Sequence, residues 1–247
     1  MIATAALQGH WRRNWLRAPG FEDSTTRVHW VQAGNWCADI RVPLIRPDIA
    51  AAGSLSALSG RDLAVLLAAE GFAGQTSLAG NVCTWARTWN WRGFPCPVDV
   101  GALSFDEAGQ MIEDGVHADY REAWVQVPGA TWHAEAIEAD DADGMLISND
   151  TSFVLALGQR GAEASPFLAN AFSEGSISPQ DAALAFASVY VMGHWDKGFG
   201  IADLSTQPFC EGTAVLNRAK ATAVLTLPNF HGTAVARSLR ISPLFSN

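Results

Sequence analysis

The sequence predicts a mainly β fold in which antiparallel strands close into two barrels in tandem, with one short helix in each half. Three observations predict it. Ten tryptophans occur among the 247 residues, and most lie in segments where polar and apolar side chains alternate, as in half-buried strands. Short apolar segments follow one another between regular turns, which is typical of a β-barrel or a β-sandwich. Finally, features of the first half recur in the second.

The clearest strands flank the turn Gly34-Asn35, within residues 27–43. A Gly-Asn pair between two segments of period two predicts a hairpin with one apolar face. Large aromatic side chains on the inner face of a curved sheet either fill a core or line a cavity for an apolar guest. The residues that share this predicted face are Val28, Trp30 and Gln32 before the turn, and Trp36, Ala38, Ile40 and Val42 after it.

Turn residues and caps place the other elements. Residues 7–17 form a first strand, and Ser59 caps a helix over 61–70 that Gly71 ends. Pro128-Gly129 separates the halves, so 1–127 and 128–247 are predicted to form the N-terminal and the C-terminal barrel. Further strands are expected over 75–78, 82–91, 100–105, 110–112, 120–127, 131–139, 145–157, 189–195, 200–204, 213–216, 221–227 and 233–241, and helical segments over 166–172 and 179–189.

A spacing of 119 residues relates the two halves. Ser59-Gly60-Arg61-Asp62 precedes one Ala/Leu-rich helix, and Ser178-Pro179-Gln180-Asp181 precedes another at this spacing. Gly74 and Gly193 are related by the same interval. We therefore expect two copies of one barrel, although matches among Gly, Ser and Ala also arise by chance.

Composition excludes several classes of function. Sixteen Lys and Arg against 25 Asp and Glu give a net charge of −9, which argues against nucleic acid and anionic membranes as partners. The chain has no signal-peptide pattern and no apolar run long enough to span a membrane, and its four scattered cysteines suit a reducing compartment. We expect a cytoplasmic protein without metal or cofactor, because the six histidines show no zinc-binding spacing and no nucleotide fingerprint occurs.

Two short motifs resemble the start of a lipocalin barrel. Gly9-His10-Trp11 begins the first predicted strand, and Gly193-His194-Trp195 recurs later. In lipocalins, such a Trp closes one end of the barrel, and an Arg from a late strand packs on the indole through a cation–π contact. The resemblance therefore assigns barrel closure to Trp11 with Arg121, and to Trp195. The alternative is that both tryptophans are ordinary core or edge residues.

A wider pattern resembles a fungal family of proteins made of two lipocalin-like barrels, whose known member interacts with a casein-kinase-type kinase and has no assigned function. This chain looks like a bacterial relative of that family. The resemblance is best over 7–125 and implies a two-barrel fold and a non-catalytic character. It is carried by Trp11-Arg12, Thr25-Thr26-Arg27-Val28, Trp30-Val31-Gln32, residues 38–43, Gly71-Phe72-Ala73-Gly74, Cys83-Thr84-Trp85 and residues 111–115.

We expect the barrel to bind a small hydrophobic or aromatic molecule between Trp side chains, with a few polar groups that orient it. The candidate ligand-binding residues are Trp30, Gln32, Trp36, Arg41, Trp85 and Trp89. Strand alternation raises one conflict, because Asp39 and Arg41 fall on the face opposite Trp36. Without a bulge, Arg41 and Trp36 cannot both point inward.

Two other functions stay open. A barrel packed solid with Trp and Phe would be a protein-interaction module with an exposed apolar patch. A cofactor-independent hydratase or isomerase would need a buried carboxylate or His with a shifted pKa, for which Glu113, Asp39 and His29 are the candidates. No nucleophile motif or catalytic triad spacing occurs, so we assign no catalytic residue and favour binding over catalysis.

Overall fold

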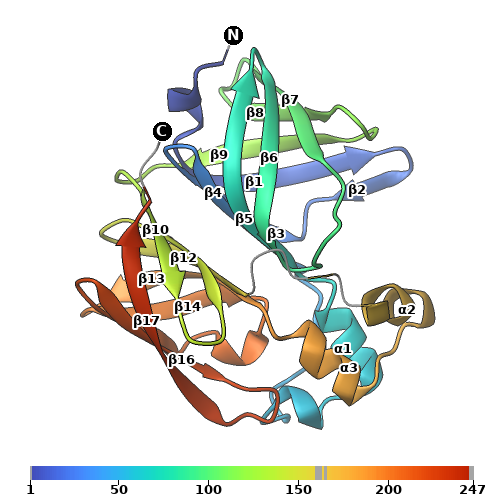
Figure 1. The fold of residues 1–247 in the computed structure, drawn as a ribbon. Coiled ribbons are helices and arrows are strands. Elements are labelled where there is room, and N and C mark those ends of the chain that lie inside the picture. Colours follow the sequence, from blue (N-terminus) through green and yellow to red (C-terminus); the bar gives the residue numbers. More distant parts are fainter. Residues whose placement is uncertain (1, 159–162, 164–165, 245–247) are drawn as a thin grey trace.

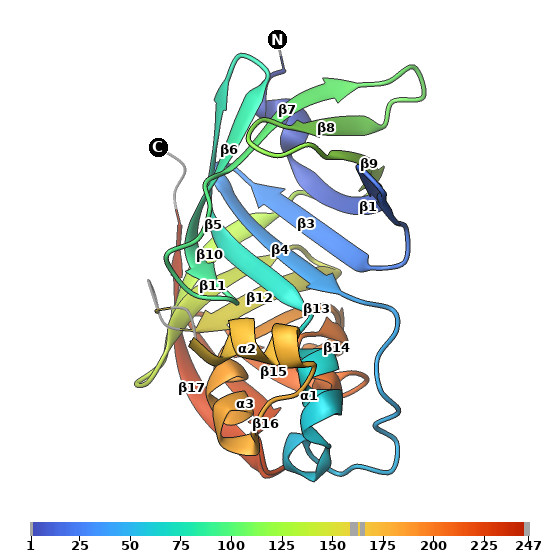
Figure 2. The ribbon, with the colours of Figure 1, turned by 90° about the vertical axis from the view of Figure 1, so that its right-hand side faces the viewer.

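A computed structural model describes residues 2–158, 163 and 166–244 of the chain. Its strands form two closed, eight-stranded antiparallel barrels that lie one above the other (Figure 1). Figure 2 shows the same arrangement from the side, with the helices gathered beside the second barrel. The predicted fold class is therefore confirmed.

The first barrel closes because β1 pairs with both β3 and β9. The short strand β2 (Phe21–Asp23) continues the sheet beyond this closure by pairing with the end of β1. Each other strand pairs with its neighbour in sequence. The eight strands are β1 (Gly9–Ala18), β3 (Arg27–Ala33), β4 (Trp36–Val42), β5 (Glu70–Ala79), β6 (Val82–Asn90), β7 (Asp99–Phe105), β8 (Met111–Gly115) and β9 (Arg121–Val127).

The second barrel closes through the pairing of β10 with β17. The segment predicted as one strand over 145–157 is a hairpin, because Asn149 forms a side-chain turn with Thr151 and Ser152. The strands are β10 (His133–Glu138), β11 (Asp143–Ser148), β12 (Ser152–Gly158), β13 (Val189–Asp196), β14 (Phe199–Ser205), β15 (Ala214–Ala219), β16 (Thr222–Pro228) and β17 (Ala234–Pro243).

Helices follow the third strand of each barrel. The first half has α1 (Gly60–Leu66), whereas the second has both α2 (Pro166–Glu174) and α3 (Pro179–Ala185). These two helices coincide with the predicted helical segments 166–172 and 179–189, but they are two separate helices where one per half was expected. In the described part of the chain, three short 3-10 helices accompany them: η1 (Thr4–Leu7), η2 (Leu55–Ala57) and η3 (Pro208–Cys210). Within the described residues, none of the helices has the length and hydrophobicity needed to cross a membrane.

The repeated helix starts have the same cap. Ser59 Oγ accepts a hydrogen bond from the Asp62 amide, and Ser178 Oγ accepts one from the Asp181 amide. Helix α1 ends before residue 70, and Gly71 lies inside β5 instead of ending the helix. There a side chain would collide with the Tyr190 ring of the second barrel, 2.6 Å from the position of its Cβ.

The repeated glycines also occupy equivalent places. Gly74 lies at a β-bulge between β5 and β6, and Gly193 lies at a β-bulge between β13 and β14. At both, a Cβ would overlap a carbonyl oxygen of the neighbouring strand, that of Ala86 or of Ile201. The bulge brings the two backbones so close that only glycine fits.

Three apolar clusters hold the molecule together: one inside each barrel and a larger one between the barrels. Strands β3 and β4 contribute Val31, Ile40 and Val42 to the cluster between the barrels, where they meet Met145 and Tyr190 of the second barrel. The face of β4 predicted to line the interior therefore points outward. Its apolar residues are buried by the second barrel.

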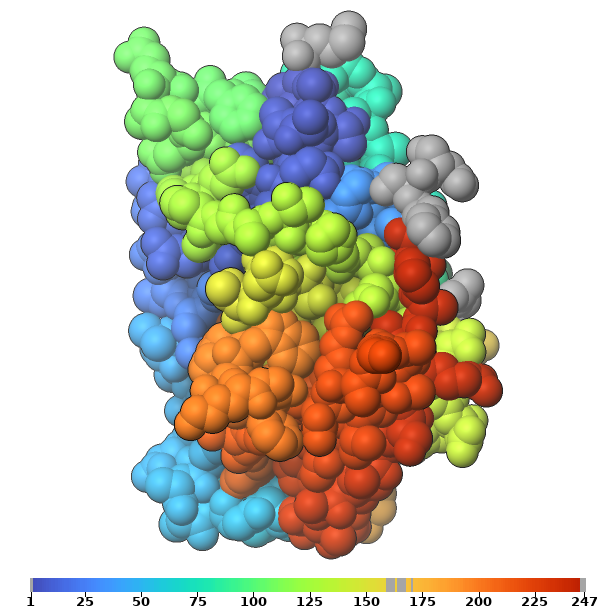
Figure 3. Space-filling view, turned by 90° about the vertical axis from the view of Figure 1, so that its left-hand side faces the viewer, coloured from blue at the N-terminus to red at the C-terminus, as the bar shows by residue number. Residues whose placement is uncertain are grey.

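The connection between β4 and α1 runs along the second barrel, so the two halves are interleaved. Arg46 forms an ion pair with Glu211 at 2.6 Å, and the Ser56 amide donates to the Phe230 carbonyl at 2.9 Å. The space-filling view shows this segment in light blue against the orange and red atoms of the second barrel (Figure 3).

Candidate functional site

Four tryptophans fill one part of the first barrel. Trp30 is in contact with Trp11, Trp85 and Trp124, with ring centroids 5.9 to 6.4 Å apart. All four are at most 6% exposed. The Trp11 indole N–H donates to the Leu7 carbonyl of η1 at 2.8 Å. These rings therefore form a packed aromatic core and not the wall of an open lumen.

Charged side chains fill another part of the same interior. Arg13 on β1 bridges Glu122 of β9 and Asp23 of β2, and Arg41 binds Asp39 two residues earlier on β4 at 2.8 Å. Burial raises the pKa of both Asp39 and Glu122, and the nearby arginines oppose that rise. Such pairs inside a barrel cost desolvation energy, so they are weak evidence for stability and stronger evidence for a function.

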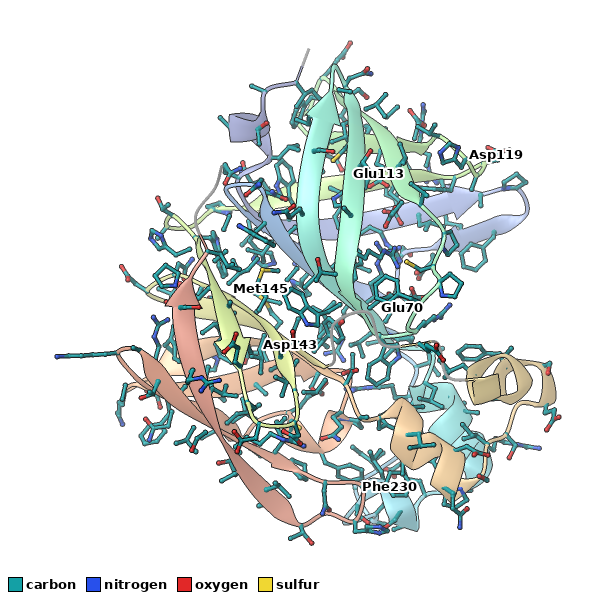
Figure 4. All side chains as sticks on the ribbon, viewed as in Figure 1. Glu70, Glu113, Asp119, Asp143, Met145 and Phe230 are labelled. Carbon is teal, nitrogen blue, oxygen red and sulfur yellow. The ribbon has the colours of Figure 1, made fainter. Side chains whose placement is uncertain are left out.

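Glu113 is a third buried carboxyl of this group. It lies on β8 directly opposite Glu122 on β9 and is 5% exposed. Burial, followed by the Glu122 charge, raises the pKa of Glu113 to about 8. Tyr120 donates its hydroxyl to Glu113 Oε1 at 2.7 Å, and Trp124 donates its indole N–H to Oε2 at 3.2 Å. Figure 4 shows Glu113 within the first barrel.

Two glycines make room for the Tyr120–Glu113 pair. Gly101 on β7 and Gly115 on β8 are direct cross-strand partners. A Cβ on Gly101 would lie 2.6 Å from Glu113 Cγ, and one on Gly115 would lie 2.5 Å from the Tyr120 ring. Glycine inside a strand weakens the strand. The two glycines therefore lower the strand propensity here but leave space for the Tyr120–Glu113 pair.

The space left inside the first barrel is very small. A void of about 10 Å³ lies between Trp30, Asp39, Arg41, Glu113 and their neighbours. That volume is about enough for a single water molecule. An apolar ligand therefore has no room among these side chains.

A cleft of about 630 Å³ lies where the charged interior reaches the surface, a volume within the range of small-molecule sites. One wall is the loop 93–98 of the first barrel. The other is helix α2, which lies between β12 and β13 in the sequence. Figure 4 shows Glu70 at this end of the barrel. The apolar lining includes Pro95, Cys96, Pro97, Val98, Leu168 and Phe172.

Polar groups form the inner end of the cleft. Arg87 and Asp99 are paired there, and Asp99 also lines the internal void, so the cleft and the barrel interior share this residue. Arg92 binds Glu70 at 2.7 Å and lies over the Phe172 ring at 5.1 Å. Tyr120 also lines the cleft. An apolar cleft ending on a few ordered polar groups suits an amphipathic small molecule.

The predicted ligand-binding residues separate into two sets. Trp30, Gln32, Arg41 and Trp85 lie inside the first barrel, whereas Trp36 and Trp89 belong to the apolar cluster between the barrels. Alternation explains Trp36, because Cys37, Asp39 and Arg41 take the inward positions of β4. At Trp89, the β-bulge opposite Gly74 shifts the register of β6, so the Trp89 side chain falls on the outer face of the barrel. The Gln32 amide is hydrogen-bonded at both ends, since it donates to the Gly34 carbonyl and accepts from Thr76.

The assignment of barrel closure needs correction for Arg121. Glu122 and Trp124 take the inward positions of β9, so Arg121 points outward and pairs with Asp114 at 2.6 Å. Arg13, and not Arg121, is the arginine buried beside β9. Trp11 lies in the first interior next to η1. Trp195 is half-buried and lies against Phe153 of the second interior, with ring centroids 4.9 Å apart.

Of the three residues considered for catalysis, Glu113 and Asp39 are inside the first barrel, but His29 is not. His29 bonds His10 at 2.8 Å on the outer face, near Trp132. Sequence reasoning missed Tyr120, Asp99 and Glu122 as neighbours of Glu113. Among the described residues, no three His, Cys, Asp or Glu side chains are placed to hold a metal ion.

Comparison with solved structures finds the same overall fold in an uncharacterized protein from Saccharomyces cerevisiae. The two structures align with a TM-score of 0.56 over 95% of this chain and 98% of that one, at 11% sequence identity. This confirms the two-barrel part of the expectation drawn from the fungal resemblance, and at such low identity it shows the fold alone. No family model matches the sequence, and no curated protein matches it.

Proposed function

We propose that this chain binds a small, largely apolar molecule in the cleft between loop 93–98 and α2. The ligand lies at the mouth of the first barrel, not between the tryptophans inside it. The observation that carries this proposal is the contrast between a void of about 10 Å³ in the interior and a cleft of about 630 Å³ at its charged end. The shifted pKa of Glu113 beside the cleft supports it.

Cys96 offers a direct test, because it lines the cleft and is half-buried, whereas Cys37, Cys83 and Cys210 are buried. The rate at which a thiol reagent such as dithiobis(nitrobenzoate) modifies Cys96 reports occupancy of the cleft. N-phenyl-1-naphthylamine, a neutral apolar fluorophore, serves as the probe. Its binding should raise its own fluorescence and slow the modification of Cys96 in parallel.

Two matched variants locate the probe. Val98 lines the cleft and is 67% exposed, so Val98→Arg should fold normally and weaken the probe at least about fivefold through lost apolar contact. Val125, 36% exposed on β9, does not line the cleft, and Val125→Arg should bind like the wild type. Fluorescence without protection of Cys96, or equal affinity of both variants, would refute the cleft as the site.

A protein-interaction module is the second candidate. The filled first barrel is what this function requires, and Leu44 and Ile45 expose 58% and 81% of their surface after β4. A double change of Leu44 and Ile45 to Ser should then remove a partner that co-purifies with the wild-type chain, and leave naphthylamine binding unchanged.

A further inference from the structure

Tyr120 connects the buried carboxyl group to the cleft. The tyrosine lines the cleft, whereas Glu113 lines the void inside the barrel. The hydrogen bond of 2.7 Å between them joins the lining of the cleft to the interior of the barrel. Gly101 and Gly115 leave the space in which both side chains sit.

We propose that Tyr120, supported by Glu113, recognises the polar end of the molecule in the cleft, and that this end is a neutral hydrogen-bond acceptor such as a ketone or aldehyde carbonyl. The inference rests on the proposed function, since it names the class of ligand for the same cleft. Tyr120 is the contacting residue, and Glu113 is a positioning residue that sets the direction of the Tyr120 hydroxyl.

The proton on Glu113 determines that direction. An ionised carboxylate only accepts, so it holds the Tyr120 O–H and leaves the phenol oxygen as an acceptor toward the cleft. A protonated carboxyl donates to the phenol oxygen, which frees the Tyr120 O–H to donate to a ligand. The pKa of Glu113 near 8 makes the protonated form the main one at neutral pH. Burial keeps the pKa of Tyr120 far above its usual value.

The groups around Glu113 affect how readily its carboxyl ionises at neutral pH. Burial and the negative charges of Glu122 and Asp99 raise the pKa of Glu113, whereas the hydrogen bond from Tyr120 and the charge of Arg41 lower it. Arg41 and Arg13 each already face another carboxylate. The titratable or charged groups packed around Glu113 are Tyr120, Glu122 on β9, Asp99 on β7, Cys83 on β6, Asp39 and Arg41 on β4, and Arg13 on β1.

A neutral carbonyl suits the cleft better than a carboxylate. The two cations of the lining, Arg87 and Arg92, are already paired with Asp99 and Glu70, and these four charges sum to zero. A ligand carboxylate would meet no net positive charge in this lining, because each arginine already faces an acid. A carbonyl needs only the one donor that Tyr120 supplies.

The test compares two probes with the same apolar body, 2-acetylnaphthalene and 2-ethylnaphthalene. For the wild type at about pH 6.5, the ketone should bind about fivefold more tightly, the effect of one net hydrogen bond. At about pH 9.5, above the pKa of Glu113, that preference should disappear. Tyr120→Phe should bind both probes equally at either pH, because it lacks the hydroxyl donor.

Glu113→Gln separates this role from a structural one. The Gln amide can donate to the Tyr120 oxygen and accept from Trp124, as the protonated acid does, so this variant should prefer the ketone at both pH values. If both probes bind the wild type equally, or if Tyr120→Phe keeps the preference, the inference fails while the proposed function stands. If neither probe binds the wild type, both fail.

Discussion

Gly101 on β7 lies directly opposite Gly115 on β8, and each occupies a place where a methyl group would collide with one member of the Tyr120–Glu113 pair. Gly101 borders the Glu113 side chain, and Gly115 borders the Tyr120 ring. The backbone of the first barrel is thus shaped around this pair.

Replacing either glycine by Ala should destabilise the protein and disturb the pair. Overpacking at Gly101 should cost about 2 kcal/mol of unfolding free energy, measured by urea denaturation, because the Glu113 carboxyl must move. Gly129→Ala is the control, since only one side-chain atom lies near, at 3.9 Å. A Gly101→Ala variant as stable as the control would contradict the packing described for Glu113.

The stability of the protein should fall between about pH 5 and pH 8 because of Glu113. Its pKa is 4.5 in the unfolded chain and about 8 in the folded protein, so the folded state binds more protons in this window and is destabilised as the pH rises. Glu113→Gln cannot titrate. Between about pH 5 and pH 8, the unfolding free energy of this variant should therefore fall less than that of the wild type, by on the order of 2 kcal/mol. Parallel curves for both proteins would show that Glu113 ionises normally.

The two histidines on the outer face of the first barrel should make the protein less stable as the pH falls, whereas Glu113 makes it less stable as the pH rises. Burial lowers the pKa of His10 to about 3 and of His29 to about 4. The stability they give is complete above about pH 6.5 and is lost as the pH falls toward 4, when the unfolded chain binds protons that the folded one excludes. His29→Gln should flatten the unfolding free energy between about pH 7 and pH 4.5, whereas the exposed His231→Gln should not.

Equivalent bulges should respond alike in the two barrels. Gly74→Ala and Gly193→Ala each place a methyl group on a carbonyl of the next strand, so each should lower the unfolding free energy by about 3 kcal/mol or prevent folding. Gly53→Ala, with no atom near its added methyl group, should be close to neutral. A mild effect at one glycine and a severe one at the other would mean that the bulges are not equivalent.

Sequence reasoning predicted the barrels well because strand alternation and turns are local signals. The hairpin at Gly34-Asn35 and the caps at Ser59 and Ser178 lie where these signals placed them. The interval of 119 residues relates Gly74 and Gly193, which lie at equivalent bulges. Helix α1 was predicted too long, because its apolar periodicity runs into a strand that begins at Glu70. Local patterns do not show where such a helix meets a strand.

The direction of each face could not be predicted in the same way. Strand β4 has an apolar face with Ile40 and a charged face with Asp39 and Arg41, and the apolar face seemed to belong inside. The second barrel covers that face, so the charged residues occupy the interior. A chain with two barrels buries both faces of such a strand, and period two alone cannot distinguish the two sides.

The cleft could not be predicted from the sequence either, because its two walls come from segments that are far apart in the chain. Val98 comes from the first barrel and Phe172 from a helix inserted in the second. Glu113 was a predicted candidate for catalysis, but its hydrogen-bond partner Tyr120 lies beyond the turn that follows β8. The glycines at 101 and 115 are the signal that could have linked them, since paired glycines within strands indicate a large neighbour.

The most direct test of the central claim is a crystal structure of this protein with 2-acetylnaphthalene bound. We expect the naphthalene rings to lie between loop 93–98 and helix α2, with the carbonyl oxygen within hydrogen-bond distance of the Tyr120 hydroxyl. Rings found among Trp30, Trp85 and Trp124 inside the barrel, or a cleft that stays empty at saturating ligand, would contradict it.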